Sequence, residues 1–374
     1  VGGTIFYPLK KSAISKGLKI FPQTEARSLV ISTEGRVLGI KALMLPSGKI
    51  AEKHKKLMSK AETFQMLIPQ NMPGAFIPQF IGKIYVNRAQ KIERNYREVV
   101  HIKANKGVCL SAGGFIFNRE MVEDNAPKYK DGMPLGTSHD TGSGIRLGQS
   151  VGGKTDHMNR VTAWRMINPP MAFAQGLVVN KQGERFGNEM VYGATLGDAM
   201  CEDHDGKAYL ILDQELFAQA KEEAAAALPF QRDSARVLMY FNAKKRKTLQ
   251  ELSKIYNIPE ESLADAVKKY NAAARNETSC EFQKNSKDMK ELKAPFYIMD
   301  ISIDSAMAPL PCLTLGGLRV NEETGEVLNQ SNVEIPGLYA AGRTAVGICS
   351  NIYVSGLSVA DCIFSGRRIG QNLN

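Results

Sequence analysis

A stretch near the carboxyl end of the chain gathers hydroxyl groups where a helix is expected to begin. In "YVSGLSVADC", Tyr353 and Ser355 precede Gly356, and Ser358 follows it. The first turn of a helix has backbone N–H groups without partners and carries a partial positive charge. It therefore stabilises negative charge that develops on a bound group, and a glycine lets the backbone come close to that group. The simpler interpretation is that Ser355 is only the helix N-cap, which uses one hydroxyl of the three.

Two further stretches, "GVCLSAGGF" and "GLYAAGR", each read as a buried strand that ends in small residues. Ala112, Gly113 and Gly114 follow the first strand, and Gly342 and Arg343 end the second. Small side chains at the carboxyl end of a strand let a planar or diphosphate ligand approach the backbone. Each stretch alone is equally typical of an ordinary turn, but two of them in one chain favour a ligand site.

A third polar stretch, "VVNKQGERFGNEMVYG", reads as a hairpin around Gln182 and Gly183 with charged residues at its end. Tyr192 follows, directly before a glycine. A single tyrosine is more often a packed ring with a satisfied hydroxyl than a catalytic group. Tyr192 becomes a candidate for proton transfer only if the fold brings it to the other hydroxyls.

Composition excludes several classes of protein. The chain has 374 residues, 43% of them hydrophobic, and no run of about 18 apolar residues that would predict a membrane span. The six cysteines form no C-x-x-C pair, and the five histidines are far apart, so we expect no metal site and no disulfide scaffold. Scattered cysteines fit a reducing, cytoplasmic location. The net charge of +10 suits an anionic ligand or membrane better than nucleic acid, because aromatic and basic residues do not interleave.

The apolar pattern predicts alternating strands and helices, and hence an α/β fold with a mostly parallel sheet and a second, largely helical lobe. The expected helices are 2–17, 119–125, 214–228, 259–275, a glycine-opened helix in "DTGSGIRLGQSVGG", and the closing helix from about Leu357. Three strands are expected within 18–45, and others at "VVHIKA", at 107–112 and in "TLGGLRVNEETGEVLNQSNVEIPGLYAAG".

Residues 51–97 form a basic insert that interrupts the alternation of strands and helices. Nine Lys or Arg residues against three Glu give it a net charge of +6. Its middle, "MLIPQNMPGAFIPQFIG", is apolar and contains three prolines, which predicts a helix, an apolar loop and a second helix. Apolar residues between basic ones suit peripheral contact with an anionic membrane. A solvated basic surface is the alternative.

Five blocks in this order resemble the FAD-dependent fumarate reductase/succinate dehydrogenase flavoprotein superfamily. They are "SAGGF", "DTGSGIRLGQSVGG", "GLVVNKQGERFGNE", "TLGGLRVNEETGEVL" and "IPGLYAAGR…GLSVADCIFSGRRIG", and together they span most of the chain. Within the superfamily the chain is most similar to the 3-ketosteroid dehydrogenases, through "GGTIFYPL", "VYG" and "YVSG". The Tyr-x-Ser-Gly form resembles the Δ4-(5α) branch more than the Δ1 branch.

The resemblance implies an FAD-binding, Rossmann-like (GR2-type) domain with an inserted α+β substrate-binding domain. We expect 1–150 and 306–374 to form the first and 151–305 the second. It implies FAD as cofactor, an apolar, steroid-like ketone as substrate and an external electron acceptor. The residues expected to contact FAD are Ala112, Gly113, Gly114, Gly142, Gly342, Arg343, Ser350, Asn351, Gly356, Leu357 and Ser358.

The catalytic roles follow from the same resemblance and from the chemistry. Dehydrogenation beside a ketone needs a polarised carbonyl oxygen and a group that takes the α-proton. We expect Tyr353 and the Gly356 N–H to polarise the ketone, and Ser355, relayed through Tyr192, to move the proton. A fumarate reductase-like activity is the alternative. It would need cationic clamps such as those that "HMNRVTAWRMINPPMAFAQG" offers at His157, Arg160 and Arg165, although its Trp, prolines and methionines suit an apolar wall better.

Two departures from the superfamily pattern are visible. The chain begins "VGGTIFYPLKK", without Met, and lacks the strand-G-x-G-x-x-G turn and following acidic residue that hold the FAD diphosphate and ribose. This predicts that the first βαβ unit is missing from the chain, and an inactive flavoprotein fragment is a further alternative. Arg343 stands where many members carry Glu, which affects the expected ribityl contact.

Overall fold

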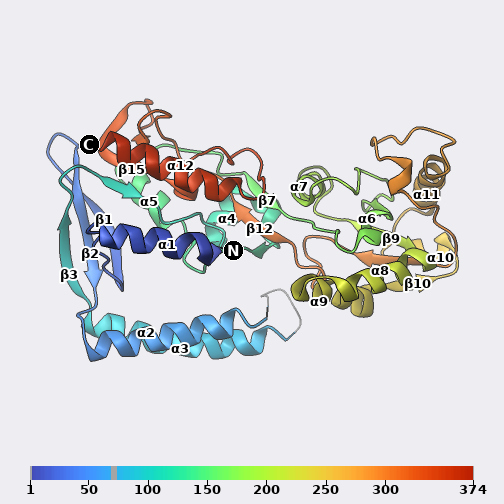
Figure 1. Ribbon diagram of the computed structural model, residues 1–374, viewed down its shortest axis with the longest axis horizontal. Coiled ribbons are helices and arrows are strands. Elements are labelled where there is room, and N and C mark those ends of the chain that lie inside the picture. Colours follow the sequence, from blue (N-terminus) through green and yellow to red (C-terminus); the bar gives the residue numbers. More distant parts are fainter. Residues whose placement is uncertain (1, 69–73, 374) are drawn as a thin grey trace.

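The computed structural model describes residues 2–68 and 74–373 and shows two lobes joined by several crossings of the chain (Figure 1). The first lobe contains three groups of strands and the helices around them. Its elements are α1 (Gly2–Ser15), β1 (Thr24–Ile31), β2 (Val37–Met44), α2 (Lys49–Gln65), α3 (Phe76–Tyr96), β3 (Glu98–Lys103), β4 (Val108–Leu110), α5 (Ser143–Gln149), β6 (Thr155–Asp156), β13 (Gly317–Leu318), β14 (Glu326–Leu328), β15 (Glu334–Ala340), the 3₁₀ turn η4 (Gly342–Thr344) and α12 (Leu357–Asn372).

The second lobe is built on a four-stranded antiparallel sheet in the order β10-β11-β9-β8. Its elements are α6 (Met171–Ala174), β8 (Leu177–Val179), α7 (Gly193–Asp203), β9 (Tyr209–Asp213), α8 (Gln214–Ala226), α9 (Pro229–Val237), the π-helical turn η2 (Leu238–Asn242), β10 (Lys244–Arg246), α10 (Leu249–Ser253), α11 (Glu260–Ala274), η3 (Ser286–Asp288) and β11 (Phe296–Asp300). Between the lobes lie α4 (Arg119–Asn125), η1 (Pro127–Tyr129), β5 (Met133–Pro134), β7 (Val161–Ala163) and β12 (Pro311–Thr314).

Buried apolar residues form a separate core in each lobe. All five residues of β9, the run "YLILD", are buried, because β9 lies between β11 and β8 in the sheet and α8 packs against it. The largest cluster of buried apolar residues extends from Phe115 to Cys312 and includes strands β8, β9 and β11. A separate cluster around Leu110, Leu318 and Leu338 fills the first lobe.

The parallel sheet expected from the sequence is small. Among the described residues, the named strands pair in parallel at two places, β4 with β15 and β5 with β12, and every other named pair is antiparallel. The expectation of a mostly parallel sheet is therefore wrong for the part of the chain that is described. Residues 24–103 instead form the antiparallel sheet β1-β2-β3, because the turn at Gly35, with φ of 82°, joins β1 directly to β2. Only two of the three strands expected within 18–45 are present.

The basic insert folds as predicted into two antiparallel helices, α2 and α3, between strands β2 and β3 (Figure 1). Pro69 and Pro73, two of its three prolines, lie outside the described residues, whereas Pro78 is buried within the first turn of α3. Elsewhere the helices expected at 119–125, 214–228 and 259–275 are confirmed as α4, α8 and α11. Within 2–68 and 74–373, no helix has both the length and the apolar character needed to cross a bilayer.

Candidate functional site

The carboxyl ends of β4 and β15 meet, which brings the two glycine-ended strands together. Leu110 pairs with Ala340 in parallel register. The two glycines of the segment that follows β4 have no room for side chains. A Cβ atom on Gly113, whose φ is 82°, would lie 2.0 Å from Asp140 Oδ1, and one on Gly114 would lie 2.3 Å from Thr314 Oγ1. Glycine is therefore required at both positions to keep this backbone against its neighbours.

Arg343 extends from the turn after β15 to the same place. Its guanidinium donates a hydrogen bond to the buried carboxylate of Asp140. The Nη1 atom of Arg343 is buried and has no hydrogen-bond partner among the described residues. The neighbouring Thr344 hydroxyl donates to the carbonyl of Gly113 over 3.1 Å and so ties the turn to the end of β4. The buried Nη1 donor without a partner, next to the glycine backbone, therefore suits an acceptor oxygen of a bound ligand.

The start of α5 closes this side of the site. Gly142 has φ of 74° and is the N-cap of α5, with no side chain capping the helix, and its N–H donates to the carbonyl of Gly114 over 2.9 Å. A Cβ atom on Gly144 would lie 3.1 Å from the Cβ of Ala112 and 3.0 Å from Thr344. Ala112 and Gly142 thus lie beside the ends of β4 and β15.

Helix α12 begins at Gly356 without a side-chain cap. Gly356 adopts φ of 86° as the N-cap, and no side-chain hydrogen bond caps the helix. The interpretation of Ser355 as an N-cap is therefore wrong. A Cβ atom on Gly356 would meet no atom within 4 Å, so open space adjoins the helix start. Ser355 and Gly356 are exposed, and Leu357 and Ser358 are partly buried.

The only tryptophan of the sequence joins the two candidate tyrosines. The ring centroid of Trp164 lies 5.8 Å from that of Tyr192 and 6.2 Å from that of Tyr353. Trp164 is itself fixed by α7, because a Cβ atom on Gly193 would lie 2.6 Å from its Cδ1 and 2.7 Å from its Nε1. Tyr192 and Tyr353 are thus brought to one indole, although no hydrogen bond or ring contact among the described residues joins either tyrosine to Ser355.

Ser350 and Asn351 are engaged within the chain. The Ser350 hydroxyl donates to the carbonyl of Leu315 over 2.8 Å and accepts from the N–H of Gly347 over 2.9 Å. It is buried and stabilises the turn before α12. Asn351 is exposed, and its side-chain oxygen lies 3.0 Å from Nε2 of His157.

An apolar cavity of about 380 Å³ lies on one side of Trp164. This size is within the range of small-molecule sites. Its walls come from β5, the segment after β7, α6, α9 and the segment before β12. The described residues that line it are Met133, Leu135, Trp164, Arg165, Met166, Ile167, Pro169, Phe173, Gln231, Ser234, Ala235, Val237, Leu238, Ile301, Met307, Ala308, Pro309 and Pro311.

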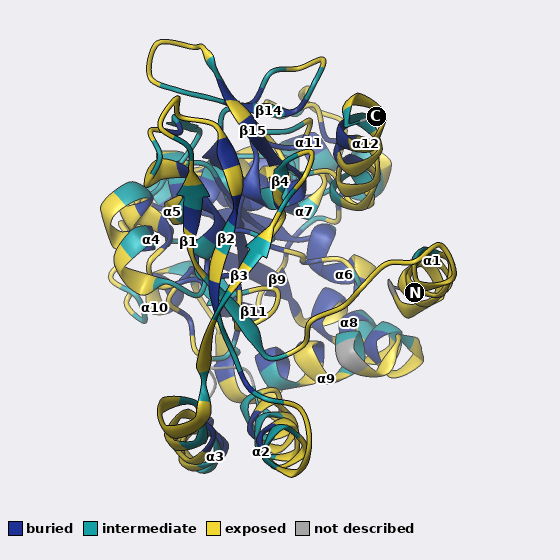
Figure 2. Ribbon diagram, turned by 90° about the vertical axis from the view of Figure 1, so that its left-hand side faces the viewer, coloured by how far each residue is buried: buried dark blue, intermediate teal, exposed yellow. Residues whose placement is uncertain are grey.

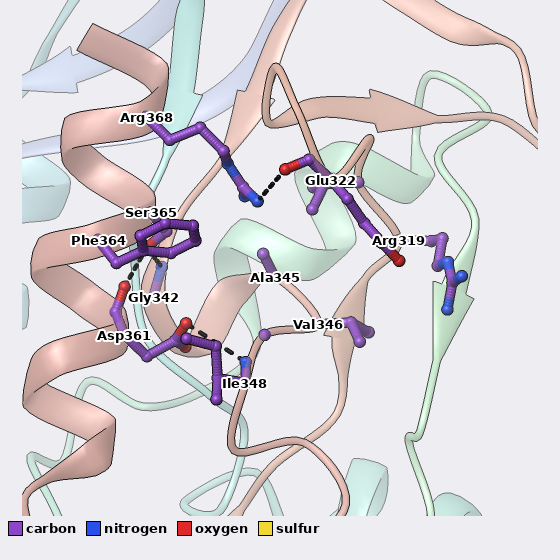
Figure 3. A pocket seen from close by; sticks show the side chains of 12 residues that line it. Arg319, Glu322, Gly342, Ala345, Val346, Ile348, Asp361, Phe364, Ser365 and Arg368 are labelled. Atoms are coloured by element: carbon purple, nitrogen blue, oxygen red, sulfur yellow. Dashed lines mark hydrogen bonds between the residues drawn. The ribbon is translucent and has the colours of Figure 1, made fainter. Parts of the chain in front are cut away.

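A second cavity, of about 390 Å³, lies between α12 and the turns at 319–322 and 342–348 (Figure 3). Hydrogen bonds hold its walls together. Gly342 N donates to the Ser365 hydroxyl over 3.0 Å, and Arg368 donates to the carbonyl of Glu322 over 2.9 Å. Asp361 accepts from the N–H of Ile348 over 3.3 Å. The carboxyl-terminal half of α12 is thus anchored, whereas its first turn adjoins open space.

The polar hairpin stretch that precedes Tyr192 forms a buried ion cluster. Both carboxylate oxygens of Glu189 accept hydrogen bonds from Arg185, and Lys284 donates to Glu189 over 2.9 Å. The side chains of Glu189 and Lys284 are both fully buried. Burial alone would raise the pKa of Glu189, but the cations of Lys284 and Arg185 hold it below its ordinary value. The charged residues Arg185 and Glu189 of this stretch are therefore explained by a structural ion cluster, without a role in a ligand site.

Sequence spacing missed Asp140 and Thr314. Asp140 pairs with Arg343, and the Thr314 hydroxyl accepts from the N–H of Phe115 over 3.0 Å. Each partner is remote along the chain, so no local motif could identify the contacts. The one available signal for Asp140 was its place directly before the glycine-opened helix.

Three comparisons with known proteins relate the chain to flavoproteins. Residues 1–356 match the family model described as FAD binding domain. A 3-oxo-5-alpha-steroid 4-dehydrogenase of Comamonas testosteroni is 37% identical over 350 residues, which cover 91% of this chain and 63% of that protein. A probable fumarate reductase of Shewanella frigidimarina is 26% identical over 275 residues, covering 71% of this chain and 44% of the relative.

The crystal structure of the 3-ketosteroid-Δ4-(5α)-dehydrogenase from Rhodococcus jostii, in complex with 4-androstene-3,17-dione, superposes with a TM-score of 0.74 at 25% identity. The match covers 98% of this chain and 62% of that one. The chain thus spans somewhat less than two thirds of the length of the steroid dehydrogenases it matches.

Proposed function

Because the chain belongs to the FAD binding domain family, we propose that it is part of a flavin-dependent dehydrogenase of 3-ketosteroids or similar enones. The observation that carries the proposal is the meeting of Tyr353 and Tyr192 on Trp164, which also lines an apolar cavity. The likeness to a 3-oxo-5-alpha-steroid 4-dehydrogenase supports the same activity and favours the Δ4-(5α) branch.

The residues around β4, β15 and α12 fit FAD. The unpartnered Nη1 of Arg343 offers a donor, and the uncapped start of α12 offers backbone N–H groups next to open space. We propose that Ala112, Gly113, Gly114, Gly142, Gly342 and Arg343 hold the chain of the cofactor. Leu357 and Ser358 would lie against its ring, and Ser358 would offer its backbone N–H, since the N–H of Leu357 already donates to the carbonyl of Val354 over 3.0 Å. Ser350 and Asn351 would shape the turn beneath. When bound, FAD supplies the acceptor for the hydride that the substrate loses.

The chain's own residues would handle the ketone and the α-proton. The Tyr353 hydroxyl and the Gly356 N–H would donate hydrogen bonds to the ketone oxygen and stabilise its developing negative charge. The acidified α-proton would pass to Ser355 and leave through Tyr192. An unassisted serine or tyrosine hydroxyl is a weak base near neutral pH, so this relay is needed. The substrate loses a proton and a hydride and gains a carbon–carbon double bond.

The proposed domains follow this division of roles. Residues 1–150 and 306–374 would bind FAD, and 151–305 would bind the substrate. A dicarboxylate substrate receives less support, because Arg165 is the only cationic side chain among the described residues that line the cavity. The fumarate reductase-like alternative would need several cations there.

The activity is tested on the purified protein with all the chain that its natural gene encodes. We expect a flavin absorbance spectrum that bleaches anaerobically when a saturated 3-ketosteroid is added, and turnover when a dye serves as external electron acceptor. A flavin that stays oxidised with steroids but turns over with fumarate and a reductant would contradict the proposal. Absence of bound flavin would favour the inactive-fragment alternative.

We also propose that the α2–α3 hairpin binds an anionic membrane surface, where a steroid-like substrate dissolves. Large apolar side chains at its far end are exposed: Met66 by 72%, Leu67 by 65%, Phe76 by 74% and Phe80 by 65%. The hairpin extends from the first lobe, and its surface is mostly exposed (Figures 1 and 2). Its net charge of +6 complements anionic lipid.

Liposome sedimentation tests this contact. Replacing both Phe76 and Phe80 by Gln is expected to weaken binding to phosphatidylserine-containing vesicles by roughly tenfold, because exposed phenylalanines lose their transfer into the lipid interface. Binding by the wild-type protein should also fall as salt rises. The matched control is Phe6→Gln on α1, where Phe6 is 58% exposed. Equal loss in control and variant, or no salt dependence, would rule out the contact.

A further inference from the structure

The apolar cavity beside Trp164 contains one charged group whose function the proposed dehydrogenation does not explain. Arg165 is only 5% exposed and lines the cavity together with apolar side chains. The pKa of its guanidinium is lowered by burial to about 10, so it stays protonated at neutral pH. A permanent positive charge therefore lies in the wall of a cavity that otherwise suits a hydrocarbon skeleton.

The guanidinium of Arg165 has no ion-pair partner among the described residues, and the charge of Asp300 acts on it only from beyond ion-pair distance. Its Nη2 donates to the carbonyl of Ser302 over 3.1 Å, and its buried Nε has no hydrogen-bond partner among the described residues. No carboxylate of residues 2–68 or 74–373 lies within 4 Å of its guanidinium to form an ion pair. The nearby thiols of Cys201 and Cys312 give no charge, because burial raises the pKa of each.

A buried cation without an ion-pair partner is costly, whereas a neutral side chain could donate to the Ser302 carbonyl equally well. A planar guanidinium with free donors matches a carboxylate better than it matches a lone carbonyl. We infer that Arg165 binds the carboxylate of an apolar ketone acid, which enters the cavity with its skeleton against Trp164. The inference rests on the proposed function and specifies its substrate class: a 3-ketosteroid with an acidic group remote from the ketone.

Calorimetric titration of the flavin-loaded protein with two matched ligands tests this inference. One ligand is a 3-ketosteroid with a carboxylate on ring D, and the other is its neutral methyl ester. We expect the acid to bind at least about tenfold more tightly, as hydrogen bonds to a charged group contribute more than neutral ones. In Arg165→Gln that preference should vanish while the ester keeps its affinity, and Arg165→Lys should restore part of it.

The matched control is Arg236→Gln, an exposed arginine on the cavity-lining helix α9, which should leave the preference unchanged. Equal affinity of the wild-type protein for acid and ester would overturn the inference but not the steroid assignment. This comparison uses the wild-type protein alone, so it does not depend on whether a variant folds. A preference that survives in Arg165→Gln would overturn it too. Binding of neither ligand would overturn the steroid assignment and the inference together.

Discussion

Replacing Tyr353 by Phe is expected to lower kcat on a 3-ketosteroid by about 10²–10³-fold, because the ketone oxygen loses one of its two proposed donors as negative charge develops. Ser355→Ala is expected to lower kcat by a similar factor through loss of the group that takes the α-proton. Neither hydroxyl caps α12, whose N-cap is Gly356, so neither change should affect the helix start. Stopped-flow bleaching of the flavin measures the loss directly.

The flavin spectrum and the melting temperature separate a chemical effect from a structural one. Both should match the wild-type values in Tyr353→Phe and Ser355→Ala. Tyr96→Phe, at the exposed end of α3, is the matched control and should retain full turnover. Because the two hydroxyls act on one reacting ketone, the double variant should lose less than the product of the single losses. Full turnover by both single variants with flavin bound would remove Tyr353 and Ser355 from the mechanism.

The second large effect is on stability. Lys284→Met or Glu189→Gln is expected to reduce the free energy of unfolding by about 3–5 kcal/mol. Glu189→Gln leaves the buried Lys284 without a counter-charge, and Lys284→Met leaves the buried Glu189 with Arg185 alone. Lys284 also donates to the carbonyls of Ala174 and Gly176, over 2.6 and 3.1 Å, and these bonds are lost with it. Denaturant unfolding gives the difference, with the exposed Glu222→Gln as control, which should change stability little.

The pH dependence checks which group is responsible. The pKa of Glu189 is lower in the folded chain than in the unfolded one, so its contribution is present above the unfolded pKa of about 4.3 and disappears as pH falls through the folded value. The stability gap between wild type and Glu189→Gln should therefore narrow in acid. A gap that stays constant from neutral to acid pH would show that the loss arises from packing and not from charge.

Local patterns predicted the elements of the fold better than their pairing. The α2–α3 hairpin followed from helical periodicity on both sides of a proline-rich apolar run, and α8 and α11 followed from strong helix formers. The pairing of the strands into sheets did not follow from local patterns. Strands β1 and β2 pair antiparallel through a tight turn, and β4 finds β15 more than two hundred residues later along the chain. Pairing direction depends on such connections, which strand propensity does not record.

The candidate site shows the same limit. Glycines, hydroxyls and their order led to the prediction of Tyr353, Ser355 and the ends of β4 and β15 as site residues. The sequence could not predict that Tyr353 lies against Trp164 or that Arg343 pairs with Asp140, since each contact joins residues far apart along the chain and forms only in the folded structure. The charge of Arg165 was visible, but its burial in an apolar wall was not. What the sequence cannot provide is the environment that gives a residue its chemistry.

The close contact between Gly193 and Trp164 has a consequence for how this site can diversify. Any larger residue at 193 would press on the indole and shift both tyrosines and the cavity wall together. New substrate shapes are therefore more accessible to selection through the apolar residues that α9 contributes to the cavity wall. Position 193 is therefore constrained to glycine, whereas variation can accumulate in the part of the cavity wall that α9 provides.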